Sequence, residues 1–251
     1  MHTIAAWSQS VNPAGAFTKI NAVTDQHIKV SGTKIYVPAF NQIIGALACA
    51  GATAPGEVRI TSPSLRRVNP FYVTPVDNAL VPISPPAGRF FADSPIPLDV
   101  NESLECECSS TPGAVAQLSF VVALANGAVP PVSGLIYTAD CNITVTLVAG
   151  AWAYSEITFP DDLPIANYDV VGARLQCAAG VAFRLIPVGA ALRPGGWCVA
   201  SVQAIDALFQ RCGGLGVWCS FNTVSPPGVE VLSSAAAGSA TYELYLDLIK
   251  R

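Results

Sequence analysis

Apolar and polar positions alternate along many short segments of this chain, with the two-residue period of β-strands. The segment 241–249 is the clearest case, because apolar residues at even positions alternate with Glu243, Tyr245 and Asp247. Segments rich in Val, Ile, Thr, Leu and aromatic residues, bounded by turn residues, predict strands at 27–30, 42–49, 57–61, 71–74, 104–108, 116–124, 142–148, 155–159, 168–177, 182–188, 197–202, 216–221, 229–232 and 241–249.

Turns and one short helical pattern in each half separate these strands. The 20 prolines and 20 glycines include groups that cannot continue a hydrogen-bonded ladder, at 85–88, 130–131, 194–196 and 226–228. Between Val202 and Arg211, Ile205, Leu208 and Phe209 have the spacing of one helix face, and a shorter counterpart spans 76–80. We expect these helices to pack over a sheet edge.

The order of these features repeats after about half of the chain. Val58-Arg59-Ile60 is followed 125 residues later by Phe183-Arg184-Leu185, and Glu105 is followed at the same distance by Glu230. Further matches occur in the same order, pairing 43–46 with 170–173, 67–73 with 193–199, 76–80 with 205–208 and 104–113 with 229–238. Collinear matches over most of the chain indicate a tandem duplication.

A half-length repeat with seven or eight short strands favours a sandwich or jelly roll over a propeller, which would repeat at a shorter period. We therefore expect an all-β fold of two tandem jelly-roll β-barrels or sandwiches, with a short helix in each repeat. The expected divisions are an N-terminal arm at 1–25, a first jelly roll at 26–127 and a second at 128–251, with a linker at 125–133. The small polar residues of the arm predict either an arm that orders on assembly or a disordered tail.

The composition predicts a chain that lives in an assembly. Hydrophobic residues make up 51% of the 251 residues and charged residues only 12%, about half the usual charged share. A surface so poor in charge is expected to be covered by neighbours. The net charge of −4 and the lack of a basic arm argue against direct nucleic-acid binding.

Membrane insertion is disfavoured because a spanning helix needs about 20 apolar residues. The longest apolar segments, 114–124 and 180–192, are interrupted by polar residues or proline. The first residues do not resemble a secretory signal, so synthesis in the cytoplasm is expected. In that compartment reduced, buried thiols are favoured over disulfides for the cysteines at 49, 106, 108, 141, 177, 198, 212 and 219.

Few residues suggest catalysis. His2 and His27 are the only histidines, too few for a His-based triad or a His-rich metal site. Cys106 and Cys108 should point to the same face of a strand, as core thiols rather than zinc ligands.

Other candidate groups have structural interpretations. The clustered carboxylates of Glu102, Glu105 and Glu107 could serve glycoside hydrolysis only with a facing partner. Asp161-Asp162 is typical of a solvated turn, and the glycine-rich 213–216 lacks the P-loop lysine and predicts a turn. Strand-like neighbours favour core packing of Trp197 and Trp218. We therefore predict that the chain is not an enzyme and has no catalytic, cofactor-binding or metal site.

The duplicated all-β organisation, the acidic charge and the near absence of histidine resemble the double jelly-roll major capsid proteins of tailless, membrane-containing bacterial viruses and, more distantly, the adenovirus hexon. The resemblance rests on architecture and on no diagnostic motif. It implies a structural virion protein whose homotrimers form pseudo-hexameric capsomers of an icosahedral shell. The implied partners are neighbouring capsomers, minor capsid or penton proteins, and an internal viral membrane contacted by the arm.

Two other classes of function stay open. A tandem jelly-roll carbohydrate-binding protein, or a viral spike or decoration protein, would expose aromatic or acidic clusters at loop ends. A polysaccharide-acting sandwich enzyme would need two facing carboxylates.

Overall fold

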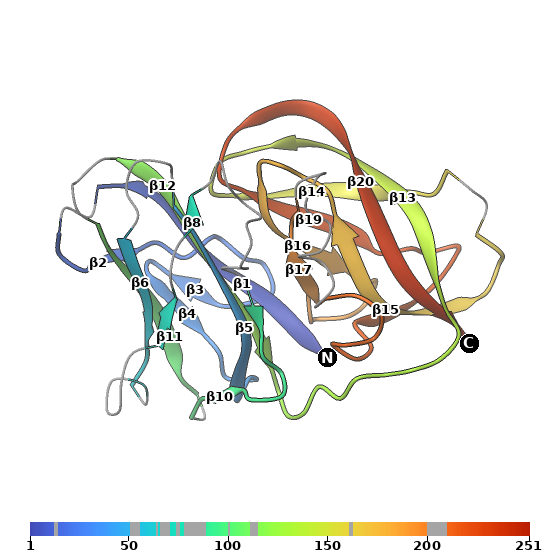
Figure 1. Cartoon of the computed structure of the whole chain (residues 1–251), viewed down its shortest axis with the longest axis horizontal. Coiled ribbons are helices and arrows are strands. Elements are labelled where there is room, and N and C mark those ends of the chain that lie inside the picture. The colour runs from blue at the N-terminus through green and yellow to red at the C-terminus, as the bar shows by residue number, and fades with distance from the viewer. Residues whose placement is uncertain are drawn as a thin grey trace.

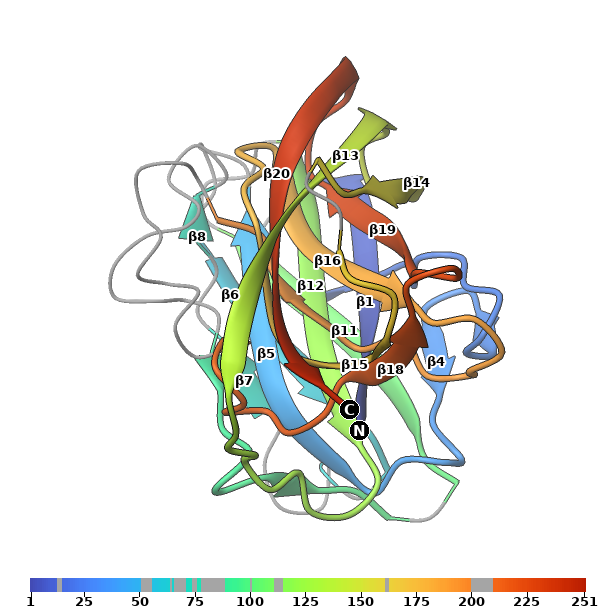
Figure 2. The same ribbon diagram turned by 90° about the vertical axis from the view of Figure 1, so that its right-hand side faces the viewer.

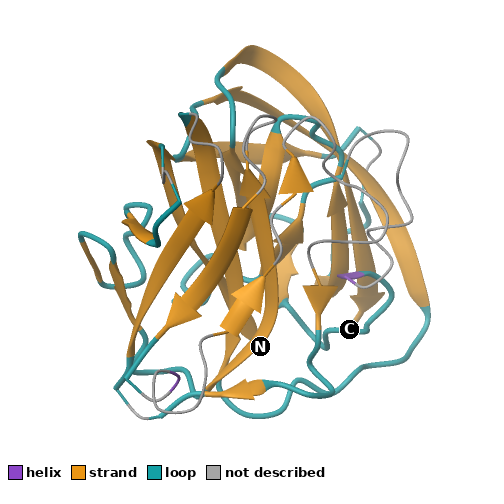
Figure 3. Cartoon of the chain, turned by 60° about the vertical axis from the view of Figure 1, so that its left-hand side comes forward, coloured by secondary structure: helices purple, strands orange, loops and turns teal. Residues whose placement is uncertain are grey.

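Strands dominate the fold, as the alternating apolar pattern predicts (Figures 1 and 3). The computed structural model describes residues 1–12, 15–50, 56–63, 65, 71–73, 76–77, 89–99, 101–110, 115–160, 163–199 and 210–251. The chain is all-β, with curled sheets whose strand pairs are antiparallel, apart from one short parallel pair between β5 and β8.

The first half of the chain forms two sheets. One has the order β1 (His2–Val11), β12 (Ala116–Ala125), β5 (Gln42–Ala50) and β10 (Ile96–Pro97), with β8 (Val76–Asp77) and β9 (Arg89–Phe90) also paired with β5. The other has the order β3 (Val30–Ser31), β4 (Lys34–Tyr36), β11 (Ser103–Ser110), β6 (Gly56–Thr61) and β7 (Phe71–Val73), with β2 (Thr18–Ile20) also paired with β11.

The second half forms one continuous eight-stranded sheet that folds over itself. Its order is β17 (Gly195–Trp197), β16 (Gly180–Ile186), β19 (Gly228–Ser233), β14 (Trp152–Thr158), β13 (Ile136–Leu147), β20 (Ala237–Lys250), β15 (Asn167–Leu175) and β18 (Cys219–Asn222). β13 pairs with β14 only at Asn142 and Ile143. This short pairing separates two groups of four strands.

The two halves share one strand order. In the first half β1-β12-β5-β10 and β2-β11-β6-β7 are neighbours, and in the second half β13-β20-β15-β18 and β14-β19-β16-β17 are. The register refines the repeat found in the sequence. Arg59 of β6 lies opposite Glu107, and Arg184 of β16 lies opposite Glu230, so Glu230 corresponds to Glu107 and not to Glu105.

Alternate residues of the first sheet face two different cores. In β12, Phe120, Val122 and Leu124 pack inside the first half, against residues such as Ile60 and Cys106 of the opposite sheet. Val121, Ala123 and Ala125 point the other way and join the core of the second half. Both faces of this sheet are therefore buried, which explains the nearly continuous apolar sequence of β12.

The halves thus stack as four layers (Figure 1). The sheet that contains β6 and β11 lies outermost in the first half, followed by the sheet that contains β1, β12 and β5. The strands β16, β17 and β19 come next, and β13, β20 and β15 lie outermost in the second half. In Figure 2 the strands of the second half lie in front of β1, β12 and β5.

The segment expected to be an N-terminal arm differs most from its prediction. Residues 2–11 form β1, which pairs with β12 over ten residues, from His2 opposite Ala125 to Val11 opposite Ala116. The segment that suggested an arm or a disordered tail is a paired strand, with residues in the cores of both halves. Residues 126–135 connect β12 to β13, in the region where a linker at 125–133 was predicted.

The predicted helices are not found in the described part of the chain. Residues 202–209 and 78–80, which carry most of those two predictions, lie outside the described residues, as do 85–88 and Asp161-Asp162. Two strands begin earlier than their patterns predict, because β13 starts at Ile136 and β20 at Ala237.

Candidate functional site between the two halves

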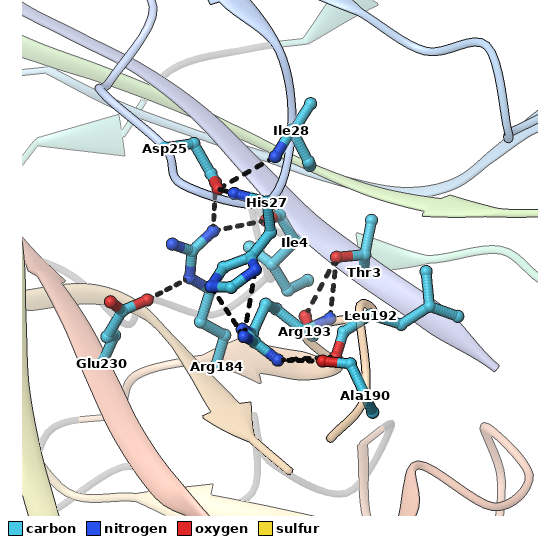
Figure 4. A network of polar contacts seen from close by, with 10 residues as sticks. All are labelled: Thr3, Ile4, Asp25, His27, Ile28, Arg184, Ala190, Leu192, Arg193 and Glu230. Atoms are coloured by element: carbon cyan, nitrogen blue, oxygen red, sulfur yellow. Dashed lines mark hydrogen bonds and ion pairs between the residues drawn. The ribbon is translucent and has the colours of Figure 1, made fainter. Parts of the chain in front are cut away.

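The contact between the halves is built on main-chain hydrogen bonds of β1 (Figure 4). The amide of Ile4 donates to the carbonyl oxygen of Arg193 at 3.0 Å. The Thr3 hydroxyl donates to the same oxygen at 3.3 Å and accepts from the Arg193 amide at 3.0 Å. The outer edge of β1 is therefore held by the segment that leads into β17.

Arg184 is the central side chain of this contact. It lies on β16, its side chain is only 2% exposed, and its Nε donates to Oε2 of Glu230 at 2.6 Å. Its Nη1 donates to the Asp25 carboxylate and, at 3.3 Å, to the carbonyl oxygen of Ile4. The guanidinium carbon lies 4.2 Å from the ring centroid of Trp152. Two carboxylates and a carbonyl thus compensate one buried cation.

A turn in the first half brings Asp25 to Arg184. The Asp25 Oδ1 accepts from the amides of His27 and Ile28 at 2.7 and 3.1 Å, the pattern of an Asx turn. Nη2 of Arg193 lies 2.6 Å from Nε2 and 3.0 Å from Nδ1 of His27. Because arginine only donates, this contact needs a neutral imidazole. Partial burial and the charge of Arg193 lower the pKa of His27 accordingly.

His2 occupies the same contact at the start of β1. Its Nε2 lies 2.9 Å from the carbonyl oxygen of Gly195 and 3.2 Å from the Gly195 amide. Its ring meets those of Trp218 and Phe90 edge to face, and Phe90 stacks on Trp197 with 4.7 Å between centroids. Complete burial lowers the pKa of His2 to about 4, so the ring is neutral at pH 7.

These hydrogen bonds, ion pairs and ring contacts hold the two halves in one relative position. The ion pair between Arg184 and Asp25 is nearly sealed from solvent, since their side chains are 2% and 4% exposed. Both histidines of the chain contact the segment 193–195 in uncharged form. The site is suited to holding two domains together and to responding when its imidazoles gain protons.

The strand 103–110 bears out the alternation predicted from the sequence. Cys106 and Cys108 point into the core of the first half and are buried. Burial raises the pKa of Cys106, and raises that of Cys108 to about 11, which keeps both thiols protonated. All eight cysteines are free thiols, and Cys212 is the exposed one.

The carboxylates of the same strand are held by cations. Nζ of Lys19 donates to both Glu105 oxygens at 2.8 and 2.9 Å, and Nη2 of Arg59 lies 2.7 Å from Oε2 of Glu107. Glu102, the third member of this cluster, is buried. Among the described residues, no three His, Cys, Asp or Glu side chains gather closely enough to hold a metal ion.

Other candidate residues take the places predicted for them. Trp197 and Trp218 are buried in the core. The glycine-rich segment 213–216 forms a turn, in which Gly213 and Gly216 have φ of +80° and +68°. A side chain at Gly213 would also strike the carbonyl oxygen of Val132.

The sequence does not predict the network around Arg184. The available signal was an arginine inside an otherwise apolar strand, 182–188, which requires a buried acidic partner. Nothing in the sequence indicates that Asp25, on the far side of the repeat boundary, supplies that partner.

Comparison with protein-family models, with curated proteins and with solved structures finds no match to this chain. In the described part of the chain, no helix is long and apolar enough to cross a membrane.

Proposed function

We propose that each half is a jelly roll and that the two stand in tandem. A jelly roll has two four-stranded antiparallel sheets, in which the first strand lies beside the last and later strands fill alternate sheets. The neighbours β1-β12-β5-β10 and β2-β11-β6-β7 fit this scheme, and so do β13-β20-β15-β18 and β14-β19-β16-β17. The short helices of the sequence prediction form no part of this proposal.

We further propose that the protein is a structural virion protein, the major capsid protein of an icosahedral shell. The observation that carries this proposal is the way in which the two similar halves pack. One half contributes the sheet with β1 and β12, whereas the other contributes the sheet with β16 and β17. Such a head-to-tail contact can continue from one chain to the next and close into a ring. Three chains would give a homotrimer with six similar halves, a pseudo-hexameric capsomer.

The composition is consistent with this role. Only 12% of the residues are charged, as suits a chain whose sides are covered by neighbours. With a net charge of −4 the chain would leave contact with the genome to other components. In this proposal the protein is not an enzyme, and its partners are copies of itself and the minor proteins of the shell.

Sizing at micromolar concentration tests the proposal. Light scattering coupled to gel filtration should give three times the mass of the chain, and electron micrographs should show six-cornered tiles. A chain that stays a monomer under these conditions would contradict the capsomer.

A carbohydrate-binding function is the second candidate, because one observation favours it. A hollow of about 270 Å³ lies between β14 and the loop before β19, lined by Tyr154, Glu156, Ile157 and residues 225–228. Tyr154 is 56% exposed and could stack on a sugar ring, while Glu156 could accept from hydroxyl groups. Glycan-array binding by the wild-type chain that is lost in Tyr154→Ala would support this alternative.

A further inference from the structure

The contact inside the chain uses one outer sheet face from each half, and the two faces are not equivalent. In the first half it is the face of β1, β12 and β5 that carries Ile4, Ile44 and Val121. In the second half it is the face of β16 and β17 that carries Arg184 and Trp197. Because the halves share one strand order, each half also has a counterpart of the face that the other half uses.

These two counterparts lie at opposite ends of the four-layer stack (Figure 1). We call the outward side of β2, β6, β7 and β11 the first-half outer face; it carries Phe17, Lys19, Arg59, Tyr72 and Glu107. We call the outward side of β13, β15 and β20 the second-half outer face; it carries Asp140, Arg174, Glu243 and Tyr245. Strand alternation places these side chains opposite the core residues of the same strands.

The first-half outer face repeats the chemistry of the contact already used. Arg59 pairs with Glu107 across β6 and β11, as Arg184 pairs with Glu230 across β16 and β19. Arg59 lies 3.6 Å from the ring centroid of Phe17, next to β2, whereas Arg184 lies over a ring of β14. Both halves therefore build the same triad of arginine, glutamate and aromatic ring on equivalent strands.

The two triads differ in what covers them. The Arg184 side chain is 2% exposed because β1 and the Asp25 turn of the other half lie on it, whereas the Arg59 side chain is 23% exposed. Tyr72, which lies opposite Arg59 in β7 and contacts it at 3.3 Å, is 51% exposed. Among the described residues, no part of the second half covers the Arg59 triad, so the first-half outer face repeats the buried contact in a more exposed form.

The second-half outer face carries an arginine–tyrosine pair of the kind that is enriched at protein interfaces. The Arg174 guanidinium lies 4.3 Å from the ring centroid of Tyr245, whose hydroxyl donates to Glu243 at 3.2 Å. Arginine and tyrosine are enriched at the centres of interfaces, where they contribute most of the binding energy. Because charged groups lie beside these rings, the face is compatible with exposure to solvent before the chains assemble.

We infer that the second-half outer face of one copy packs on the first-half outer face of the next copy, in the way that the two halves pack within the chain. This inference rests on the proposed function and assigns the surfaces that it needs. The contact is heterologous, so each chain has one donor face and one acceptor face, and a ring forms when the rotation between copies closes.

Two single substitutions test the assignment. Tyr72→Asp places an unpaired charge on the first-half outer face, and Tyr245→Asp does so on the second-half outer face. Each should weaken self-association at least tenfold, so that light scattering finds monomers where the wild-type chain is trimeric. Val188→Asp is the matched control, because Val188 is 74% exposed and follows β16, whose outer face is already covered within the chain. Tyr72→Ala and Tyr245→Ala repeat the test without an added charge, and circular dichroism reports whether each variant folds.

Mixing the two Asp variants tests the head-to-tail arrangement itself. Each variant retains the face that the other has lost, so an equimolar mixture should form dimers with one contact that cannot close. If the wild-type chain is trimeric but the Tyr variants associate as well as Val188→Asp, or if the mixture stays monomeric, the assigned faces are wrong and the capsomer proposal stands. If the wild-type chain is itself a monomer, the proposed function fails and this inference fails with it.

Discussion

Acid should loosen the contact between the halves through His2. The His2 ring is fully buried against Gly195, Trp218 and Phe90, which lowers its pKa from 6.5 to about 4. An unfolded chain therefore binds a proton at His2 more readily than the folded chain between these two pH values. The stability that this neutral imidazole contributes is complete above pH 6.5 and is lost as the pH falls toward 4.

The magnitude follows from the two pKa values of His2. Proton linkage gives a loss of about 2 kcal/mol between pH 8 and pH 5, and of about 3 kcal/mol once the pH is well below 4. His27 contributes with the same sign, because its pKa is also lowered, by partial burial and by Arg193. The carboxylates of Glu105 and Asp247, whose pKa values lie below their ordinary 4.5 and 3.8, lose their contribution at lower pH.

Urea unfolding followed by tryptophan fluorescence at pH 8, 6.5 and 5 measures this linkage. His2→Gln and His2→Phe remove the titrating group, and both should flatten the dependence of the unfolding free energy on pH by about 2 kcal/mol over this range. His27→Gln, at the rim of the same contact, is the control for the second imidazole. An unchanged slope in both His2 variants would refute the reasoning.

Three further predictions concern stability and reactivity. Arg184→Met should cost about 3–5 kcal/mol of unfolding free energy because it leaves buried carboxylates without their cation. Arg59→Met, at the equivalent position of the first half, should cost about 1 kcal/mol or less. Chemical denaturation measures both losses, and equal losses would contradict the argument from burial. A thiol reagent should modify Cys212 quickly and the seven buried cysteines only after unfolding, as counted by absorbance; rapid release of more than one equivalent would disagree. Gly195→Ala should cost about 2–3 kcal/mol, because a Cβ there would lie 2.0 Å from the carbonyl oxygen of Phe183, while Gly238→Ala, with no atom within 4 Å, should change the melting temperature little.

The positions of most strands could be predicted because the alternation of apolar and polar residues follows the alternation of buried and exposed side chains. The segments 42–49 and 229–232 each match a strand to within one residue. Prediction succeeded where one face is polar, as in 241–249, and where a short apolar run is bounded by turn residues. The predicted strand boundaries were less accurate. β20 begins at Ala237, before the predicted start at 241, because its first residues are small and their alternation gives no hydrophobic signal.

The N-terminal strand shows what local sequence cannot report. Residues 2–11 contain Ser, Gln and Thr and few large apolar groups, so they predicted an arm. Their burial comes from two partners far along the chain, β12 on one edge and Arg193 on the other. The sequence repeat matches the strands of Arg59 and Arg184 to the correct partner strands. Only the strand register shows that Glu230 corresponds to Glu107, two residues after the Glu105 to which the repeat assigns it.

The pairing of β1 with β12 also constrains how the protein can be made. His2 lies opposite Ala125, so β1 must wait for more than a hundred further residues to be synthesised before its sheet can form. At about 5–20 residues per second, that delay lasts roughly 6–25 seconds. During this delay β1 is an unpaired strand with apolar side chains. The unpaired β1 strands of neighbouring nascent chains on one messenger RNA can therefore contact one another. Slow translation should therefore favour aggregation of the nascent chain, and chaperones that shield β1 should raise the yield.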